Sequence, residues 1–324
     1  MGREAREMMS NPKIYAMLAT LTTLVYDYSI TLGQEVDLVW SRPFTFGTGL
    51  FFVTRYLPFI DLPITVSAYS SFNEDITAEE CLRRIRTATV LQMVGICVAQ
   101  LILVLRTIAI WERKLTVIVS LAVLYWLAVS CSVYVVVLFL KTLRFQKWPF
   151  QPCTTSHVDK IIFVDFVIIL LMETVVVGLT GLKALKHTWW KSSSWIIHLY
   201  KRGFIYFLLI FMASVVNLLL LLLAPDNYKL IFTDAQRVLH SILCNRVILM
   251  ILAQKEKVVQ PLAVRSNEDT HWRFARPTSM IETALDLDIF TSPAETPNNS
   301  RTKLTSDLGG KRDSSLRTLQ CVTP

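Results

Sequence analysis

Ionisable side chains stand inside several of the longest apolar stretches of this sequence. In FFVTRYLPFI, residues 51–60, Arg55 lies among phenylalanine, valine, leucine and isoleucine. A charge at the centre of a membrane helix costs about 2.5–3.5 kcal/mol on insertion scales, so several of them in one chain indicate a polar interior between packed helices. Such an interior can hold a ligand, serve a transported solute, or only fasten helices together. The candidates for these roles are Asp27, Arg55, Asp165, Glu173, Asn217 and Arg246.

Depth along the helices suggests partners for four of the charged candidates. A rise of about 1.5 Å per residue places Arg55 near the level of Asp165, and Arg246 near the level of Glu173. We therefore predict the pairs Arg55–Asp165 and Glu173–Arg246, although exchanging the partners satisfies the depths almost as well. A purely structural role, in which each pair fixes the rotation of its helices, is the alternative to a ligand site.

The other two candidates have different expected surroundings. Asp27 lies about a turn and a half from the end of its apolar run, where it can reach water or the region of Arg42. Asn217 interrupts the apolar run 203–224. Because amide side chains in membrane helices commonly hydrogen-bond to a neighbouring helix, we expect Asn217 to join two helices.

The composition indicates that lipid surrounds most of the chain. Of 324 residues, 53% are hydrophobic and 18% are charged, and the mean hydropathy is +0.45. An ordinary soluble domain carries about 25% charged residues. A helix that crosses about 30 Å of hydrocarbon needs roughly 20 apolar residues, so uncharged runs such as 115–140 predict membrane crossings.

Seven runs in all have the length of a crossing. Three of them, 14–32, 44–62 and 231–253, are the weaker ones, because each carries ionisable residues. Lipid tolerates only helices or closed barrels, and these runs lack the alternation of polar and apolar residues that barrel strands show. We predict an all-α, polytopic integral membrane protein whose transmembrane domain covers 1–253. Its seven helices are expected at about 14–32, 44–62, 87–110, 115–140, 161–182, 203–224 and 231–253.

The chain changes character after residue 253. Ser, Thr, Asp, Pro and Asn dominate from about residue 265 onward, and such a segment cannot bury enough apolar surface to fold alone. We predict that 254–324 is a polar, largely disordered cytoplasmic tail. Lysine and arginine counts do not decide the orientation, because the connections on the two faces hold similar numbers.

Two cysteines bear on the orientation. Cys81 precedes the third predicted crossing and Cys153 lies between the fourth and fifth, so both fall on one membrane face. An oxidising exterior would let them form a disulfide, with two free thiols as the alternative. If the disulfide forms, the amino terminus is outside the cell and the tail is inside.

The segments YDYSITLGQEVDLVW (26–40) and RPFTFGTGLFFVTRYLPF (42–59) resemble the amino-terminal signature of fungal, basidiomycete-type multi-pass membrane proteins that carry domain of unknown function 6533. The resemblance continues more loosely to about residue 253. Lys201-Arg202-Gly203 departs from the basic-acidic-glycine run expected there. The resemblance implies seven helices and an outside amino terminus, and it supplies no biochemical activity. The matching residues are Tyr26, Asp27, Glu35, Val36, Trp40, Arg55 and Tyr56.

Basic and aromatic residues are concentrated in a connection that is predicted to face the cytoplasm, KALKHTWWKSSSWIIHLYKR, 183–202. Cations attract anionic lipid headgroups by about 1 kcal/mol each, and tryptophan favours the interface. Coupling to a cytoplasmic signalling partner is the alternative. Nucleic acid is not an expected partner, because these cations lie between membrane spans. The inner-face candidates, of which Arg106 and Arg113 are expected to extend to the interface, are Arg106, Arg113, Lys114, Lys183, Lys186, Lys191, Lys201 and Arg202.

The sequence shows no pattern typical of an enzyme. Its five histidines are scattered without the spacing of a metal site, and no glycine-rich phosphate loop occurs. We expect no catalytic activity, no metal and no other cofactor. Seven helices, a basic inner connection and a Ser/Thr-rich tail favour a receptor-like signalling protein by analogy of fold. A transporter or channel that uses the buried ionic residues is an alternative, as is a non-catalytic scaffold, in the plasma membrane or another membrane of the secretory pathway.

Overall fold

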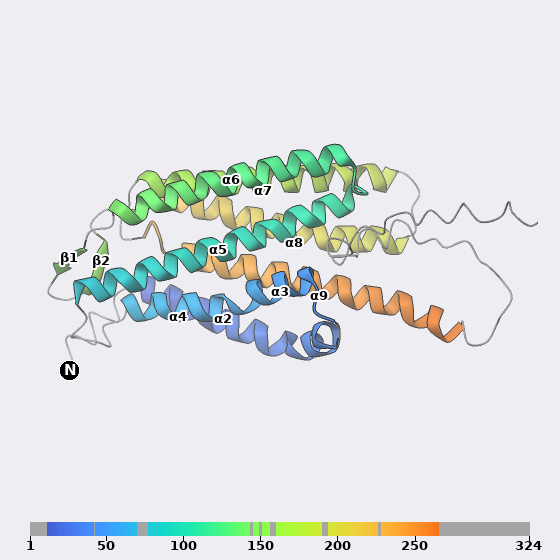
Figure 1. Cartoon of the computed structure of the whole chain (residues 1–324), viewed down its shortest axis with the longest axis horizontal. Coiled ribbons are helices and arrows are strands. Elements are labelled where there is room, and N and C mark those ends of the chain that lie inside the picture. The colour runs from blue at the N-terminus through green and yellow to red at the C-terminus, as the bar shows by residue number, and fades with distance from the viewer. Residues whose placement is uncertain are drawn as a thin grey trace, which may run out of the picture.

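The computed structural model describes residues 12–41, 43–69, 77–142, 145–148, 151–155, 160–189, 194–225 and 228–265. They form an elongated bundle whose long helices lie side by side, with a two-stranded antiparallel hairpin at one end (Figure 1). In chain order the elements are α2 (Pro12–Glu35), η1 (Val36–Trp40), α3 (Phe46–Tyr56), α4 (Pro58–Tyr69), α5 (Ala78–Ile110), α6 (Leu115–Thr142), β1 (Phe145–Trp148), β2 (Gln151–Thr155), α7 (Lys160–Trp189), α8 (Ser194–Leu223) and α9 (Thr233–Arg265).

Long apolar helices dominate the structure and confirm the predicted fold class, an all-α polytopic membrane protein. Trp126 of α6 and Leu171 of α7 are both more than half exposed, as expected for side chains that face lipid. Among the described residues, six helical segments are long and apolar enough to cross a membrane: Phe46–Tyr69, Glu79–Ile110, Leu115–Thr142, Ile161–Leu185, Phe204–Leu223 and Thr233–Ala253.

Helix α2 corresponds to the predicted first crossing, 14–32, but it is not one of those six segments. Its 24 residues extend about 36 Å at about 1.5 Å per residue, which is enough to span the hydrocarbon. Asp27, Glu35 and several threonines lower its apolar character. Length therefore allows a seventh crossing, and its feasibility depends on how the bundle accommodates the two acids.

Helix α5 begins at Ala78, well before the predicted start at residue 87. Thr77 caps it by accepting a hydrogen bond from the backbone N–H of Glu80, and two glutamates lie in the first turn, where the helix dipole favours negative charge. Arginines in the next turn made this segment resemble a loop. Hydropathy locates the part of a helix that lies in hydrocarbon, so it misses charged turns that extend into the headgroup layer.

The predicted second crossing, 44–62, consists of two helices. Thr45 caps α3 through the Thr48 N–H, and α4 follows directly at Pro58. Proline has no N–H and interrupts the helical ladder. Backbone hydrogen bonds from Leu57 to Val53 and from Asp61 to Leu57 span the break, so α3 and α4 form one span that extends to Tyr69.

Helix α9 occupies the centre of the bundle. It contacts α2, α3, α4, α5 and α8, and Figure 1 shows it running lengthwise between these helices. Its apolar window is 67% buried, compared with 28% for α6 and α7. Ser241 of α9 donates to the backbone carbonyl of Thr54 in α3, and the Thr54 hydroxyl donates to Asn245 Oδ1 of α9. Because α9 touches so many partners, its polar side chains meet those of several helices.

The described part of α9 continues to Arg265, so the first residues of the predicted tail, 254–324, are helical rather than disordered. The remainder of that tail lies outside the described residues. The predicted end of the seventh helix at residue 253 is therefore too early, and the largely disordered tail stays a prediction.

The hairpin lies at the end of the bundle where α4 ends and α5 begins, and β2 contacts both helices (Figure 1). Cys81 in the first turns of α5 is disulfide-bonded. Cys97, Cys131 and Cys244 are free. Cys153 belongs to β2, but its side chain lies outside the described residues, so its pairing with Cys81 stays a prediction.

Candidate functional site

The structure places Arg55 in an ionic network, here called the Arg55 cluster, which consists of Asp27, Thr31, Glu35, Arg55 and Arg246. All of these except Arg246, whose side chain is 37% exposed, are buried. Arg55 Nη1 lies 3.1 Å from Asp27 Oδ2, and Arg55 Nε lies 3.0 Å from Glu35 Oε2. Arg246 Nε approaches the other Asp27 oxygen at 2.6 Å. Arg55 Nη2 also donates to the Thr31 hydroxyl. Two carboxylates thus meet two guanidinium groups from α2, α3 and α9.

Neutral donors complete the hydrogen bonds of Glu35. Its Oε1 accepts from the Tyr56 hydroxyl at 2.6 Å and from the Trp40 indole at 3.2 Å. Asp27, Glu35 and Arg55 are each at most 3% exposed. Buried charges persist only when they are paired and hydrogen-bonded. Because the cluster balances its charges, the face of α2 that carries the two acids can pack against the bundle, while its opposite face stays exposed.

These partners correct both predicted pairs. Arg55 is paired with Asp27 and Glu35 rather than Asp165, and Arg246 is paired with Asp27 rather than Glu173. Helix rise gives depth but not the direction in which a side chain points around the helix axis. The expectation that Asp27 reaches water or the region of Arg42 is wrong for the same reason.

A second buried polar group, the mid-bundle cluster, consists of Asp61, Gln100, Glu173, Arg237 and His240. Glu173 Oε1 accepts from Gln100 Nε2 at 3.2 Å and lies 3.0 Å from His240 Nε2. Arg237 Nη2 lies 3.4 Å from Asp61 Oδ2. All five side chains are more than nine-tenths buried.

The mid-bundle cluster has unused hydrogen-bonding capacity. Within the described residues, all three Arg237 nitrogens, Asp61 Oδ2, Glu173 Oε2 and Gln100 Oε1 have no hydrogen-bond partner. Most buried polar atoms in proteins are satisfied by protein or ordered water. The cluster therefore combines two ion pairs with buried polar atoms that could accept or donate further hydrogen bonds.

The remaining sequence candidates have separate surroundings. Asn217 donates to Gln236, which in turn donates to Ser214 at 2.7 Å, so Asn217 joins α8 to α9 as expected. Asp165 belongs to neither cluster, and its Oδ1 has no hydrogen-bond partner among the described residues.

Arg106 does not extend to the interface as predicted. It is 6% exposed, because its side chain lies between packed helices near Cys244 of α9 rather than at the helix end. The chain turns at Trp111–Lys114, one turn further on. Arg113 and Lys114 lie in that turn, where Glu112 and Arg113 both have φ of 55°. Lys183 Nζ lies 2.8 Å from Glu112 Oε1 and so joins the turn to α7. Side chains of the other inner-face candidates, Lys186, Lys191, Lys201 and Arg202, lie outside the described residues.

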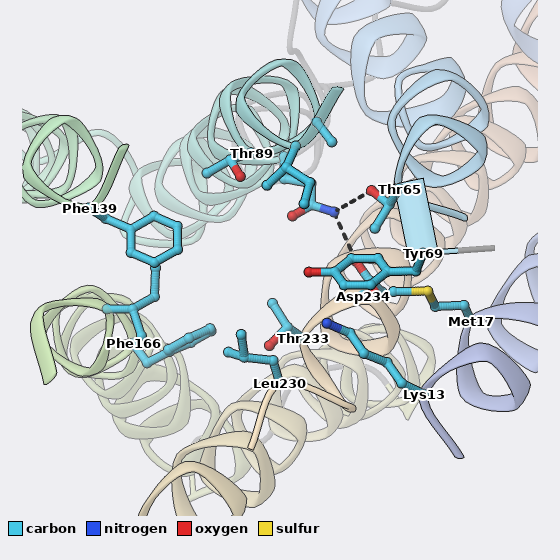
Figure 2. Close-up of a pocket in the computed structure, with 14 residues that line it drawn as sticks. Lys13, Met17, Thr65, Tyr69, Thr89, Phe139, Phe166, Leu230, Thr233 and Asp234 are labelled. Carbon is cyan, nitrogen blue, oxygen red and sulfur yellow. Dashed lines mark hydrogen bonds between the residues drawn. The ribbon is translucent and has the colours of Figure 1, made fainter. Parts of the chain in front are cut away.

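The described residues also form a cavity near the hairpin, called here the hairpin-end pocket. It encloses about 100 Å³ and is partly open. Figure 2 shows side chains from opposite sides converging on it. Its apolar wall includes Ile85, Phe139, Ile162, Phe166 and Leu230. A pocket with an apolar wall and a few convergent polar groups is the usual form of a small-molecule site.

The polar side of the pocket is built from α2, α4, α5 and α9. Gln92 Nε2 donates to Asp234 Oδ1 at 2.9 Å and lies 3.5 Å from the Thr65 hydroxyl. Lys13 Nζ stands 3.7 Å from the centre of the Tyr69 ring. Figure 2 shows the Lys13 amine directed toward this ring from the side of the pocket that Asp234 occupies.

Sequence reasoning selected no residue of the pocket and, of the five members of the mid-bundle cluster, only Glu173. Lys13 lies at the edge of an apolar run, where a cation normally reaches the headgroup layer. Asp234 and Arg237 lie in the predicted seventh crossing but were not selected as site residues. Their spacing, three residues apart on one helix, was the available signal for a polar helix face.

No group of three or more His, Cys, Asp or Glu residues within the described part of the chain has the geometry of a metal site. The arrangement supports ion pairing, hydration and recognition of a small ligand.

Fold, buried ion pairs and lipid-facing helices together define a multi-pass α-helical membrane protein. Residues 15–60 match a family model described as Family of unknown function (DUF6533). That segment contains every member of the Arg55 cluster except Arg246, so the matched sequence encodes the ionic contact between α2 and α3. No curated protein and no solved structure matches the chain.

Proposed function

We propose that this protein is a non-catalytic, receptor-like membrane protein that binds a small ligand in the hairpin-end pocket. The pocket itself carries the proposal: about 100 Å³ of partly open space lies where α2, α4, α5, α6, α7 and α9 converge, with polar groups on one side and an apolar wall on the other. A site formed by so many helices can change their packing when it is filled.

The disulfide supports an exterior position for this pocket. Cys81 lies in the first turns of α5, at the same end of the bundle as the pocket residue Ile85. Disulfides persist in oxidising compartments and are rare in the cytosol. We infer that the hairpin end faces the exterior or a secretory lumen, with α2 as a seventh crossing whose acids the Arg55 cluster neutralises.

Helix α9 supplies a physical connection from the pocket toward the opposite end. Its first turn holds Asp234 in the pocket, and Arg246, three turns further on, enters the Arg55 cluster. Between these two residues, His240 Nε2 lies 3.0 Å from Glu173 Oε1 of α7. A displacement of α9 at the pocket would therefore perturb contacts with several helices at once, which is what a receptor requires of its interior.

The opposite end offers a surface for a cytoplasmic partner. The turn Trp111–Lys114 is held against α7 by the Glu112–Lys183 ion pair, and Lys183 Nζ also lies 5.8 Å from the centre of the Trp111 ring. We propose that this turn and the connection after α7 contact anionic lipid or a cytoplasmic signalling protein.

A pocket-dependent conformational change would test the proposal. Small amines, acids and alcohols are screened for their effect on Tm of the full chain in lipid nanodiscs. Thr89→Phe, which places a bulky side chain in the pocket lining, is the blocked variant, and spin labels at the exposed residues Leu115 and Leu185 report helix movement at the inner end. We expect at least one compound to raise Tm and alter the label distance in the wild type only. Absence of any pocket-dependent effect would refute the proposal.

A transporter is the second candidate, and the mid-bundle cluster favours it. Glu173, His240 and Arg237 place ionisable groups with unpaired polar atoms at the middle of the bundle, where coupling ions or solutes bind in transporters. Flux of a bound compound into proteoliposomes that is abolished by Glu173→Gln would favour this function over the receptor. A compound that binds without flux would favour the receptor.

A further inference from the structure

We propose that the hairpin-end pocket recognises a small organic cation, and that the Lys13 amine occupies the cation position when no ligand is bound. This inference rests on the proposed binding function of the pocket and adds the chemical class of the ligand. The observation behind it is that a side-chain ammonium group already stands where a ligand ammonium would be recognised (Figure 2).

The cation position has an aromatic face and a carboxylate. Lys13 Nζ lies 3.7 Å from the centre of the Tyr69 ring, well within the range of about 6 Å over which an aromatic face attracts a cation. Asp234 interacts electrostatically with Lys13 and is 6% exposed. Ring and carboxylate form the pair of groups by which proteins commonly recognise ammonium ligands.

The carboxylate is held in place for this role. Gln92 donates to Asp234 Oδ1 and is itself placed beside Thr65, so α5 and α4 fix the orientation of an acid that belongs to α9. A carboxylate fixed by a hydrogen bond loses little freedom when a cation binds, which increases affinity. The buried Thr233 hydroxyl, without a hydrogen-bond partner among the described residues, offers one further polar contact.

Charge and mobility make Lys13 a replaceable occupant. Among the residues that line the pocket, Lys13 is the single base and Asp234 the single acid. Lys13 lies in the first turn of α2, and its flexible stem allows the amine to leave for water at the bundle end. Its departure would expose the Tyr69 ring and Asp234 to a ligand cation.

The rest of the pocket sets the size and polarity of the ligand. Phe139 and Phe166 form an apolar wall across from the polar side, and Leu230 adds an apolar surface beside Thr233 (Figure 2). About 100 Å³ of space is well below the roughly 300–1,000 Å³ of drug-sized sites. The pocket therefore fits an ammonium group with a short branched or linear apolar body.

If Lys13 competes with the ligand, removal of its charge should strengthen cation binding rather than weaken it. The full chain in nanodiscs is titrated by calorimetry with isobutylammonium, and with isobutanol and isobutyrate as neutral and anionic probes of similar shape. Lys13→Gln is expected to bind isobutylammonium about tenfold tighter, since an amine that fills the site about nine-tenths of the time weakens apparent affinity by that factor. Lys13→Arg keeps the competing cation and is expected to stay close to the wild type.

Two further variants separate the pocket from general effects. Asp234→Asn retains an oxygen that can accept from Gln92 but removes the charge, so it is expected to abolish isobutylammonium binding. Lys183→Gln removes a lysine at the opposite end of the bundle and is the matched control, with no expected change. Tm of each variant, measured without probe, establishes that it is folded.

The outcomes distinguish the inference from the proposed function. If isobutyrate binds and Lys13→Gln abolishes that binding, Lys13 is a ligand contact for an anion and the inference is overturned while the pocket stands. Binding of isobutanol alone also overturns it. If none of the probes binds the wild type or Lys13→Gln, both the inference and the proposed binding function fail for ligands of this size.

Discussion

Arg55→Leu is the most informative perturbation of the Arg55 cluster, because it removes one cation and leaves both acids buried. Asp27 keeps Arg246 at 2.6 Å, whereas Glu35, which is 0% exposed, keeps only neutral hydroxyl and indole donors among the described residues. Removing one partner of a buried ion pair costs about 3–5 kcal/mol. A typical folded protein is stable by about 5–15 kcal/mol, so we expect a large loss of folded protein and a clear drop in Tm.

A double-mutant cycle identifies the acid that matters. We expect Arg55→Leu combined with Glu35→Gln to recover much of the lost stability, because no buried charge is then left without a partner. Arg55→Leu combined with Asp165→Asn is the matched control and should show no recovery. Tm in nanodiscs and the folded fraction after size-exclusion chromatography provide the measurements. A single variant as stable as the wild type, or recovery with Asp165→Asn, would refute the ionic role described for Arg55.

Two further outcomes are expected. Gly95→Ala should lower stability by about 1–3 kcal/mol, because an added Cβ would overlap the Arg237 guanidinium, which is 1% exposed and has little room to move. Gly33→Ala, which meets nothing within 4 Å, is the control, and equal losses of Tm would contradict the close approach of α5 and α9. Peptide mapping of the non-reduced protein should give a cross-linked fragment that contains Cys81 and Cys153, and the pairing is wrong if Cys81 is joined to any other cysteine.

Hydropathy predicted the helices well, because the thickness of the hydrocarbon sets a minimum apolar length that the sequence displays directly. Residues 115–140, for example, correspond closely to α6 (Leu115–Thr142). The same signal placed the start of α5 too late and the end of α9 too early, because charged turns outside the hydrocarbon leave no apolar trace.

Side-chain partners were harder to predict than helices. The helix rise placed Arg55 and Asp165 at the same depth. Which side chains meet also depends on the rotation of each helix about its axis, and the packing of the whole bundle sets that rotation. The resemblance to a known family had selected Asp27, Glu35 and Arg55 together, and the structure shows that these three residues form direct contacts.

The hairpin-end pocket could not be predicted, because its residues come from several helices that are far apart in the sequence. Lys13 and Asp234 are separated by most of the described chain, and neither has a local motif. Arg106 was selected for its position near a helix end, which suggested an interfacial anchor. Only the packed structure shows that it is buried.

The orientation of the bundle connects the disulfide, the pocket and the inner turn, and it can be measured directly. A flexible insert carrying a glycosylation sequon is placed either between β1 and β2 or in the turn at Trp111–Lys114, and the full chain is expressed in a eukaryotic cell. We expect a glycosylated product from the hairpin insert and an unmodified product from the turn insert. Modification of the turn insert, with an unmodified hairpin, would place the pocket in the cytoplasm and contradict an exterior ligand site.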